Sequence, residues 1–261
     1  KATETVLSGR RTIEDIIDGK DKRMLAIIGP CSIHDEQAAL DYAERLLEIN
    51  EKVKDTLYLV MRVYFEKPRT NVGWKGLIND PSMDGTCDIQ QGLRKARKLL
   101  LDISKMGVPI ATEILEPIIP QYIAGLISWA AIGARTTESQ THREMASGLS
   151  MPVGFKNSTD GSLAAALNAI RAAGSPQTFP GIDQRGRTGI VRTGGNPWGH
   201  LVLRGGESPN YHAENIEDIR CLLRAQGLSE VLLVDCSHGN SRKDHRRQPV
   251  VCRSVLRQRL D

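Results

Sequence analysis

The sequence has few aromatic residues, scattered cysteines and no long hydrophobic run. Phe, Trp and Tyr make up 4% of its 261 residues, which argues against a stacking surface for nucleic acid and against an aromatic membrane belt. No apolar run approaches the roughly 20 residues that a membrane-spanning helix needs, and no signal peptide opens the sequence. The five cysteines include no CxxC pair and are odd in number, which argues against a disulfide framework. We therefore expect a cytoplasmic protein that binds neither nucleic acid nor membrane.

The charge pattern agrees with this expectation. The formal net charge is +4, a mild excess for this length. The densest basic run, Arg242–Arg247, is best interpreted as a solvated face, and no nucleic-acid-binding module is recognisable. The length suits one large α/β domain that can bury a substantial core.

Short apolar runs alternate with amphipathic segments along the whole chain. The near-continuous hydrophobic character of the runs is typical of parallel strands that are buried on both faces. The expected strands are Met24–Cys31, Thr56–Tyr64, Ile110–Leu115, Ala130–Ala134, Pro152–Asn157, His200–Arg204 and Val231–Ser237. The expected helices are Asp35–Asn50, Asp88–Met106, Pro120–Trp129, Glu138–Leu149, Ser162–Ala173, Ala213–Ala225 and Pro249–Leu260.

This alternation fits either a doubly wound sheet or a (β/α)8 TIM barrel. Seven strand–helix units and the absence of a GxGxxG or Walker A loop favour the barrel. We expect one barrel domain over residues 1–261, with an N-terminal helical extension in residues 1–22 and an inserted β-hairpin in residues 178–199. The eighth strand is absent from this sequence, so we expect the natural protein to continue beyond Asp261.

Cationic side chains lie at the ends of four of the expected strands. Arg62, Arg135, Lys156 and Arg204 each end or follow a strand, and Lys67, Arg69 and Thr70 come soon after Arg62. The carboxyl ends of barrel strands face the active site. A single cation there usually forms a salt bridge, but a row of them is repulsive unless an anion neutralises it. The pattern predicts a ligand with several phosphate or carboxylate groups.

Two further strand ends carry possible metal ligands. Cys31 ends the first expected strand and His238 follows the seventh. Each alone has an ordinary structural interpretation, and two ligands are too few for a normal transition-metal site. Glu113, on the third strand, is either a counter-ion for the cations or a group that positions water or transfers a proton.

At this point the sequence resembles a known family, the type I 3-deoxy-D-arabino-heptulosonate 7-phosphate (DAHP) synthases of the feedback-regulated branch. The matching motifs follow the family's order over nearly the whole chain. They are Ile28–Asp35 (IGPCSIHD), Val60–Thr70 (VMRVYFEKPRT), Val72–Pro81 (VGWKGLINDP), Ala131–Ser139 (AIGARTTES), His142–Leu149 (HREMASGL), Val153–Asn157 (VGFKN), Leu203–Gly206 (LRGG) and Asp235–Asn240 (DCSHGN).

The resemblance implies a metal-dependent transferase that condenses phosphoenolpyruvate with erythrose 4-phosphate, the first step of the shikimate route to aromatic amino acids. The residues implied for phosphoenolpyruvate are Arg62, Lys67, Arg135, Lys156 and Arg204, and Ala134 is implied as a further substrate-binding residue. Arg69 and Thr70 are implied for the aldose phosphate, Cys31 and His238 for two of four metal ligands, and Lys67, Glu113 and His238 for catalysis. A Glu and an Asp beyond residue 261 would complete the metal site. The metal, Mn, Fe, Co or Zn, is not distinguished.

The resemblance also implies an aromatic amino acid inhibitor and a homodimer or homotetramer. The positions that match the family's inhibitor pocket are Pro120, Gln121, Met145, Leu149, Ser150, Phe179 and Val191. Ordinary surface packing is the alternative at each of them.

Two alternatives differ in function. The first is a sister synthase that makes 3-deoxy-manno-octulosonate 8-phosphate from a five-carbon aldose phosphate. The KPRT motif, Lys67–Thr70, and the inserted hairpin argue against it. The second is a catalytically inactive, ligand-sensing paralogue, and the chemically competent strand ends argue against that.

Overall fold

The computed structural model describes residues 1–69, 71–183 and 185–260. It divides into two compact units, each described below by itself. The first comprises Lys1–Ala131, Leu149–Pro152 and Pro180–Ile190. The second comprises Ile132–Gly148, Val153–Phe179 and Val191–Asp261.

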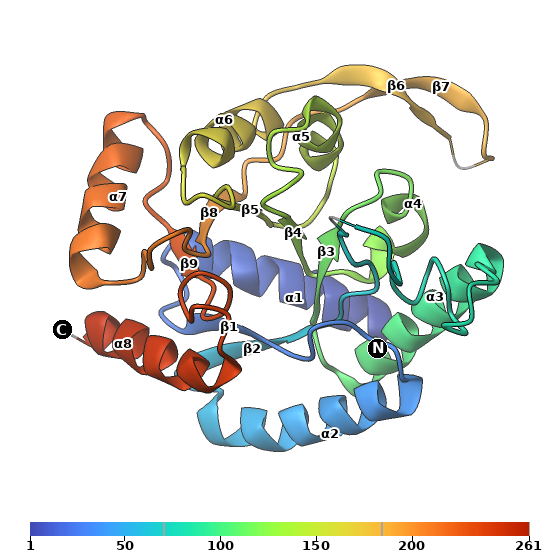
Figure 1. Cartoon of the computed structure of the whole chain (residues 1–261), viewed down its shortest axis with the longest axis horizontal. Coiled ribbons are helices and arrows are strands. Elements are labelled where there is room, and N and C mark those ends of the chain that lie inside the picture. Colours follow the sequence, from blue (N-terminus) through green and yellow to red (C-terminus); the bar gives the residue numbers. More distant parts are fainter. Residues whose placement is uncertain (70, 184, 261) are drawn as a thin grey trace. The chain divides into compact units, whose positions relative to one another are not determined.

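Parallel strands in the order β1-β2-β3-β4 form the sheet of the first unit. Its elements are α1 (Ala2–Ile17), β1 (Met24–Ile28), α2 (Glu36–Val53), β2 (Leu57–Arg62), α3 (Ile89–Met106), β3 (Ile110–Ile114), α4 (Pro120–Ile123), η1 (Ala124–Leu126) and most of β4 (Trp129–Ile132). Strand β1 pairs with β2 from Met24↔Leu57 to Ile28↔Met61, and Arg62 of β2 pairs with Ala111 of β3. This register brings the residues after β1 and β2 to one edge of the sheet, as Figure 1 shows.

Local signals explain why the helices of the first unit begin and end where they do. The Asp35 side chain accepts a hydrogen bond from the Ala38 amide at 2.9 Å and caps α2, as its position in the sequence predicts. Helix α3 ends at Gly107, which adopts the left-handed conformation with φ 105°. The N-terminal extension is helical, as expected, and forms α1.

The second unit is built on the parallel strands β5-β8-β9. Its elements are α5 (Gln140–Ser147), β5 (Val153–Lys156), α6 (Ala164–Ala173), β8 (Gly199–Leu203), α7 (Ala213–Ala225), β9 (Leu232–Val234), η2 (His245–Arg247) and α8 (Gln248–Leu260). Lys156 of β5 lies opposite Val202 of β8, and Leu203 opposite Val234 of β9. All four β5 residues are buried, as expected for a strand covered on both faces.

The expected hairpin is present. Strands β6 (Thr178–Ile182) and β7 (Thr188–Arg192) pair as a two-stranded sheet. The Asp183 amide donates to the Arg187 carbonyl at 2.9 Å and closes the connection between them. Gln184 lies outside the described residues.

All seven expected strands form, but one expected helix is wrong. The predicted helix Pro120–Trp129 is a single α turn, α4, followed by the 3-10 turn η1. Ile127 is already extended (φ −107°, ψ 134°), and the Ser128 amide donates to the Ile110 carbonyl at 2.8 Å. Pairing with β3 therefore outweighs continuation of the helix, and Trp129 becomes the first residue of β4. Among the described residues, no helix is long and apolar enough to cross a membrane.

Candidate functional site

The ends of β1 and β2 bring three of the predicted site residues of the first unit together. Nη2 of Arg62 donates to the Cys31 carbonyl oxygen at 3.0 Å, and Lys67 Nζ lies 3.5 Å from Cys31 Sγ. The Arg62 guanidinium carbon lies 4.1 Å from the centre of the Tyr64 ring, a cation–π contact. Gly29 allows this approach, because a Cβ there would lie 2.4 Å from the Arg62 carbonyl oxygen.

This arrangement lowers the pKa of the Cys31 thiol. Burial raises its pKa, but the charges of Arg62 and Lys67 and hydrogen bonds from Lys67 and Ser32 outweigh burial, so the pKa is lowered overall. Arg62 keeps donor capacity, since its buried Nε has no hydrogen-bond partner in the part of the chain that the structure describes. A buried guanidinium donor without a protein acceptor fits a site that an anionic ligand completes.

Arg69 lies in the connection that follows Lys67. It is exposed, and its Nε donates to the Trp74 carbonyl at 2.7 Å. This bond leaves its terminal Nη groups for another acceptor. Thr70, predicted to bind the aldose phosphate with Arg69, lies outside the described residues.

Two carboxyl groups lie at the end of β3. Glu113, predicted from the sequence, is half-buried on the strand itself. Glu66, which precedes Lys67, is 7% exposed and accepts hydrogen bonds from the amides of Leu115 and Glu116 at 3.3 and 3.1 Å. Burial is the main cause that raises the pKa of Glu66 to about 7; the two amide hydrogen bonds lower it and the charges of Glu116 and Glu113 raise it.

In the second unit, a charged cluster forms at the ends of β5 and β9. His238 Nδ1 lies 2.8 Å from the Asp235 carboxylate and 3.0 Å from Ser237 Oγ. Burial raises the pKa of Asp235, but the hydrogen bond with His238 and the positive charge of Lys156 hold it well below the usual range. Because Asp235 occupies Nδ1, the Nε2 atom of His238 remains for a ligand.

Amide side chains hold Arg204 at the end of β8. Asn157 Oδ1 accepts from the Arg204 amide at 2.8 Å, and Asn157 Nδ2 donates to the Gly205 carbonyl at 3.1 Å. Asn240 Nδ2 donates to the Leu203 and Asp235 carbonyls at 3.1 and 3.0 Å. These bonds link the ends of β5, β8 and β9 into one network.

Two glycines allow the loops after β5, β8 and β9 to approach closely. A Cβ at Gly206 would lie 2.3 Å from the Asp160 carbonyl oxygen, and one at Gly239 would lie 2.7 Å from the Gly206 amide nitrogen. The loop that carries Arg204 and the loop that carries His238 therefore pack backbone to backbone.

Ala134 and Arg135 lie in the turn after β4. Ala134 is half-buried and Arg135 is exposed. Thr137 Oγ1 bridges this turn to β5, since it contacts the Gly133 carbonyl at 2.9 Å and the Lys156 carbonyl at 3.1 Å. The backbone that carries Arg135 is thus tied to the backbone of Lys156.

The predicted inhibitor positions are divided between the units. Pro120, Gln121, Leu149 and Ser150 lie in the first unit, and Met145, Phe179 and Val191 lie in the second. Ser150 Oγ accepts from Arg10 Nη1 at 2.8 Å, which connects this predicted position to α1. Pro120 and Met145 are buried, whereas Gln121 and Ser150 are exposed.

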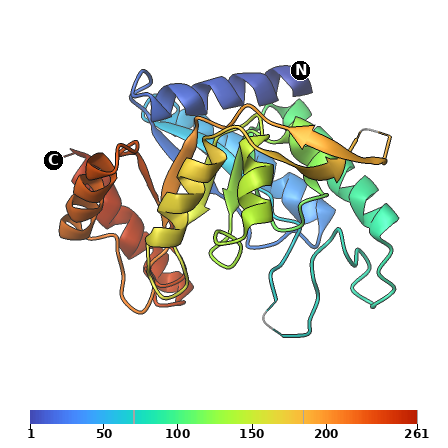
Figure 2. The same ribbon diagram turned by 90° about the horizontal axis from the view of Figure 1, so that it is seen from above.

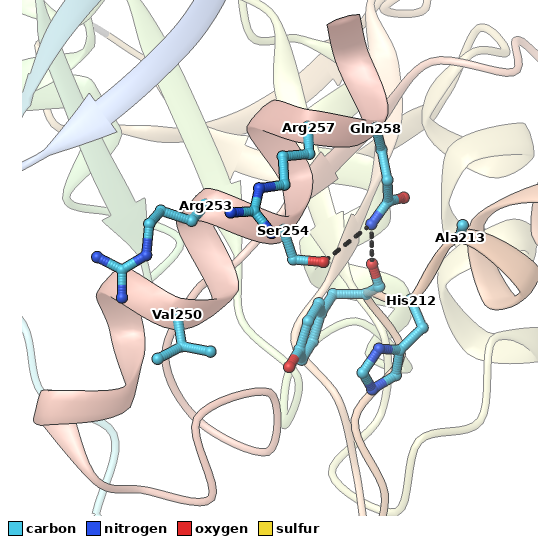
Figure 3. A pocket seen from close by; sticks show the side chains of 8 residues that line it. His212, Ala213, Val250, Arg253, Ser254, Arg257 and Gln258 are labelled. Atoms are coloured by element: carbon cyan, nitrogen blue, oxygen red, sulfur yellow. Dashed lines mark hydrogen bonds between the residues drawn. The ribbon is translucent and has the colours of Figure 1, made fainter. Parts of the chain in front are cut away.

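A separate cleft of about 380 Å³ lies between the start of α7 and α8 (Figure 3). It is lined by Tyr211, His212, Ala213, Val250, Arg253, Ser254, Arg257 and Gln258. Gln258 Nε2 crosses it with hydrogen bonds to the Tyr211 carbonyl at 3.0 Å and to Ser254 Oγ at 3.3 Å. None of the predicted site residues lines this cleft, so it is not the candidate site.

Comparison with known proteins decides the family. The family model described as the DAHP synthetase I family matches residues 4–259. The chain belongs to the DAHP synthetase I family. This agrees with the resemblance carried by the motifs and makes the chain an enzyme of the transferase class.

Individual relatives match at high identity. The Tyr-sensitive phospho-2-dehydro-3-deoxyheptonate aldolase of Escherichia coli (strain K12) is 60% identical over 256 residues, which are 98% of this chain and 72% of the relative. The Phe-sensitive aldolase of the same strain is 55% identical over 98% of this chain and 73% of its own length. A solved aldolase structure from Francisella tularensis SCHU S4 superposes with a TM-score of 0.97 at 48% identity, over 99% of this chain and 76% of that one.

The two possible metal ligands lie in different units, Cys31 in the first and His238 in the second. Each suits a divalent cation chemically, since Cys31 has a lowered thiol pKa and His238 has its Nδ1 held by a carboxylate. Among the described residues, no group of three or more His, Cys, Asp or Glu side chains is arranged to hold a metal.

Sequence reasoning did not single out Glu66, Asp235 or Asn157 as functional residues. Asp235 could have been found from its spacing, because a carboxylate three residues before a histidine after a buried strand can reach Nδ1. Glu66 could have been noticed as an acid at the end of the apolar run Val60–Glu66. Asn157 gave no signal beyond its place at the end of a strand.

Proposed function

We propose that this enzyme condenses phosphoenolpyruvate with erythrose 4-phosphate to give DAHP and inorganic phosphate. The grouping of Arg62, Lys67 and Cys31, in a chain 60% identical to a named aldolase of this kind, carries the proposal. Both substrates are anions that repel each other, and fixed cations remove that cost while orienting the reacting carbons.

The phosphoenolpyruvate site comprises five cations, with Ala134 beside one of them. They are Arg62, Lys67, Arg135, Lys156 and Arg204. The unpartnered Nε of Arg62 and the restrained backbones of Lys156 and Arg204 support the assignment. Arg69 and Thr70 bind the phosphate of the aldose.

Lys67 and Glu113 act on protons in this scheme. Lys67 Nζ donates a proton to the oxygen that was the aldehyde, and the Glu113 carboxylate orients the water that adds at C2 of phosphoenolpyruvate. Asp235 holds His238 in one tautomer and orientation.

Cys31 and His238 hold a divalent metal, with the choice among Mn, Fe, Co and Zn left open by their donor atoms. When bound, the metal supplies Lewis acidity toward the aldehyde oxygen. The lowered thiol pKa of Cys31 supports this role, because metals bind thiolates.

Further parts of the proposal concern assembly and control. We infer a (β/α)8 barrel, a homodimer or homotetramer, and a cytoplasmic location in keeping with five free thiols. The seven parallel strands and the TM-score of 0.97 support the barrel.

The effector pocket comprises Pro120, Gln121, Met145, Leu149, Ser150, Phe179 and Val191. Its ligand is tyrosine, since the Tyr-sensitive relative matches at 60% identity against 55% for the Phe-sensitive one.

The proposal is tested by measuring the release of inorganic phosphate from phosphoenolpyruvate and erythrose 4-phosphate in the presence of Mn²⁺, and turnover of this pair is the expected result. Arabinose 5-phosphate replaces erythrose 4-phosphate in a parallel assay, and faster turnover with the pentose would favour the octulosonate synthase. No turnover with either would favour the inactive paralogue.

The Lys67→Met variant should lose about 100-fold or more in kcat, the typical contribution of a positioned proton donor. Lys67→Arg is the matched control, because arginine keeps the positive charge but does not release its proton. If Lys67→Met kept near-normal turnover at saturating substrate, Lys67 would have no part in the chemistry.

A further inference from the structure

Glu66 is a buried carboxyl group for which the reaction scheme gives no role. It is 7% exposed and directly precedes Lys67 in the connection that leaves β2. Figure 2 shows that connection, in teal, as a long segment that runs away from α1 before the chain enters α3. Burial of a carboxylate costs free energy unless hydrogen bonds or opposite charges compensate for its lost hydration.

The hydrogen bonds of Glu66 reach the neighbouring strand. The register of β2 and β3 ends with Arg62 opposite Ala111, after which the Val63 amide donates to the Ala111 carbonyl at 2.8 Å. Farther along, the Glu66 carboxylate accepts from the amides of Leu115 and Glu116. The Glu66 side chain therefore links the segment after β2 to the segment after β3 by hydrogen bonds, beyond the last paired residues of the two strands.

The two segments that Glu66 connects each carry a residue of the proposed chemistry. Lys67 follows Glu66 immediately, and Glu113 lies two residues before Leu115. The Lys67 backbone is also fixed on its other side, since its amide donates to the Lys75 carbonyl at 2.9 Å. Displacement of Glu66 would move Lys67 Nζ, which lies 3.5 Å from Cys31 Sγ.

We propose that Glu66 is a positioning residue, whose ionised carboxylate ties Lys67 to the end of β3 and so fixes it relative to Glu113. The proposal rests on the function proposed above. A carboxylate can accept both amide hydrogen bonds, whereas a protonated carboxyl has one oxygen that becomes a donor. Both hydrogen bonds, from the Leu115 and Glu116 amides, are therefore complete only when Glu66 is charged.

Ionisation of Glu66 occurs within the working range of pH. Burial, with a smaller contribution from the facing acids Glu116 and Glu113, raises its pKa to about 7. The charged form therefore positions Lys67 well but is the less stable folded form. Activity and stability should change in opposite directions as the pH rises through 7.

The first test compares Glu66→Gln with the wild type in kcat and kcat/KM from pH 6 to pH 9. Glutamine resembles the protonated acid, so the ratio of wild-type to variant activity should rise about tenfold across pH 7, the effect of about one hydrogen bond. Substrate ionisation affects both proteins equally and cancels in the ratio. A ratio that is constant with pH would overturn the proposal and leave Glu66 with a merely structural role.

The second test needs no change at Glu66. Glu116→Gln removes a neighbouring negative charge and leaves the Glu116 backbone amide in place, so the inflection in the wild-type activity profile should move to lower pH. An inflection that stays in place would mean that another group titrates there, and it would contradict the proposal.

A third measurement separates this proposal from the proposed reaction. The melting temperature of Glu66→Gln should rise relative to the wild type between pH 5 and pH 8, because only the wild type ionises a buried acid there. In the same range, the Leu115 and Glu116 amides should gain hydrogen-exchange protection in the wild type alone. If both changes appear but neither substrate pair is turned over, the proposed reaction is contradicted and the positioning role of Glu66 is supported. If neither change appears, the positioning role is contradicted, whether or not the substrates are turned over.

Discussion

His238 Nδ1 lies 2.8 Å from the carboxylate of Asp235. The two residues are three positions apart in the segment directly after β9. The His238 backbone is in the left-handed region with φ 52°. The pair leaves only Nε2 of the imidazole for a ligand.

Replacement of Asp235 by Asn should therefore weaken metal binding and turnover. Loss of the carboxylate removes the partner that fixes the tautomer and orientation of His238, an effect typically of 10–100-fold. Metal affinity by calorimetry and kcat by phosphate release would measure it. Ser237→Ala is the control, since it removes the other contact of Nδ1, at 3.0 Å, without a change of charge. Equal effects of the two variants would contradict the special role of Asp235.

The five thiols should differ widely in reactivity. Cys31 is exposed and has a lowered pKa, whereas burial raises the pKa of Cys236 to about 12. Iodoacetamide at pH 7 should alkylate Cys31 first and Cys236 last, as followed by peptide mass mapping. Lys67→Met should slow the reaction of Cys31. Exposed Cys87 is the internal reference, and Cys31 reacting no faster than Cys87 would contradict the electrostatic argument.

Acid should destabilise the fold through His200. This side chain is 3% exposed, and burial lowers its pKa to about 4, partly offset by the Trp198 carbonyl at 3.0 Å. The folded-state pKa lies below the unfolded value of about 6.5, so the unfolded state binds the proton first as the pH falls. The stability that neutral, buried His200 contributes is fully present above pH 6.5 and is lost as the pH falls toward 4. The free energy of unfolding should fall by roughly 3 kcal/mol over this range.

Urea unfolding at pH 7 and pH 4 would measure this loss. His200→Gln keeps a hydrogen-bond donor but does not titrate, so its stability should fall less over the same range. The same pH dependence in both proteins would assign the acid sensitivity to other groups.

Ser150 offers a test of the effector pocket. Ser150→Val removes the hydroxyl that accepts from Arg10 and adds bulk on the surface of the first unit. Inhibition by tyrosine should weaken about tenfold, equivalent to about one hydrogen bond, with kcat nearly unchanged. Phenylalanine and tryptophan are assayed in parallel. Ser8→Val, at another exposed serine, is the control, and unchanged inhibition of Ser150→Val would exclude Ser150 from the pocket.

The strands were predictable because their hydrophobic character does not depend on distant contacts. The run Pro152–Asn157 predicts β5 to within one residue at each end, and Gly107 predicts the end of α3. The expected helix Pro120–Trp129 failed because the pairing of Ser128 with Ile110 decides that segment, and that contact is not visible in local sequence.

The candidate site, like the fold, could be predicted only in part from the sequence. Strand-end cations such as Arg62 and Lys156 could be named from the sequence, because their positions follow from the strands. The partners that fix them could not. Glu66 reaches Leu115 across 49 positions, and Asn157 reaches Arg204 across 47, so only the folded chain reveals these bonds.

The contact between the loops of Gly206 and Gly239 limits how this enzyme can be re-engineered. A side chain at Gly239 would collide with the backbone of Gly205 and Gly206, and one at Gly206 would collide with the backbone of Asp160 and Gly161 in the loop after β5. Even alanine at Gly239 would therefore force apart the loops that carry Arg204 and His238. In contrast, a Cβ at Gly85 would meet no atom within 4 Å, although its φ of +80° favours glycine. Libraries that aim to change the accepted aldose should leave the Gly206–Gly239 junction intact and place their diversity beside Gly85, outside the residues proposed to bind substrate.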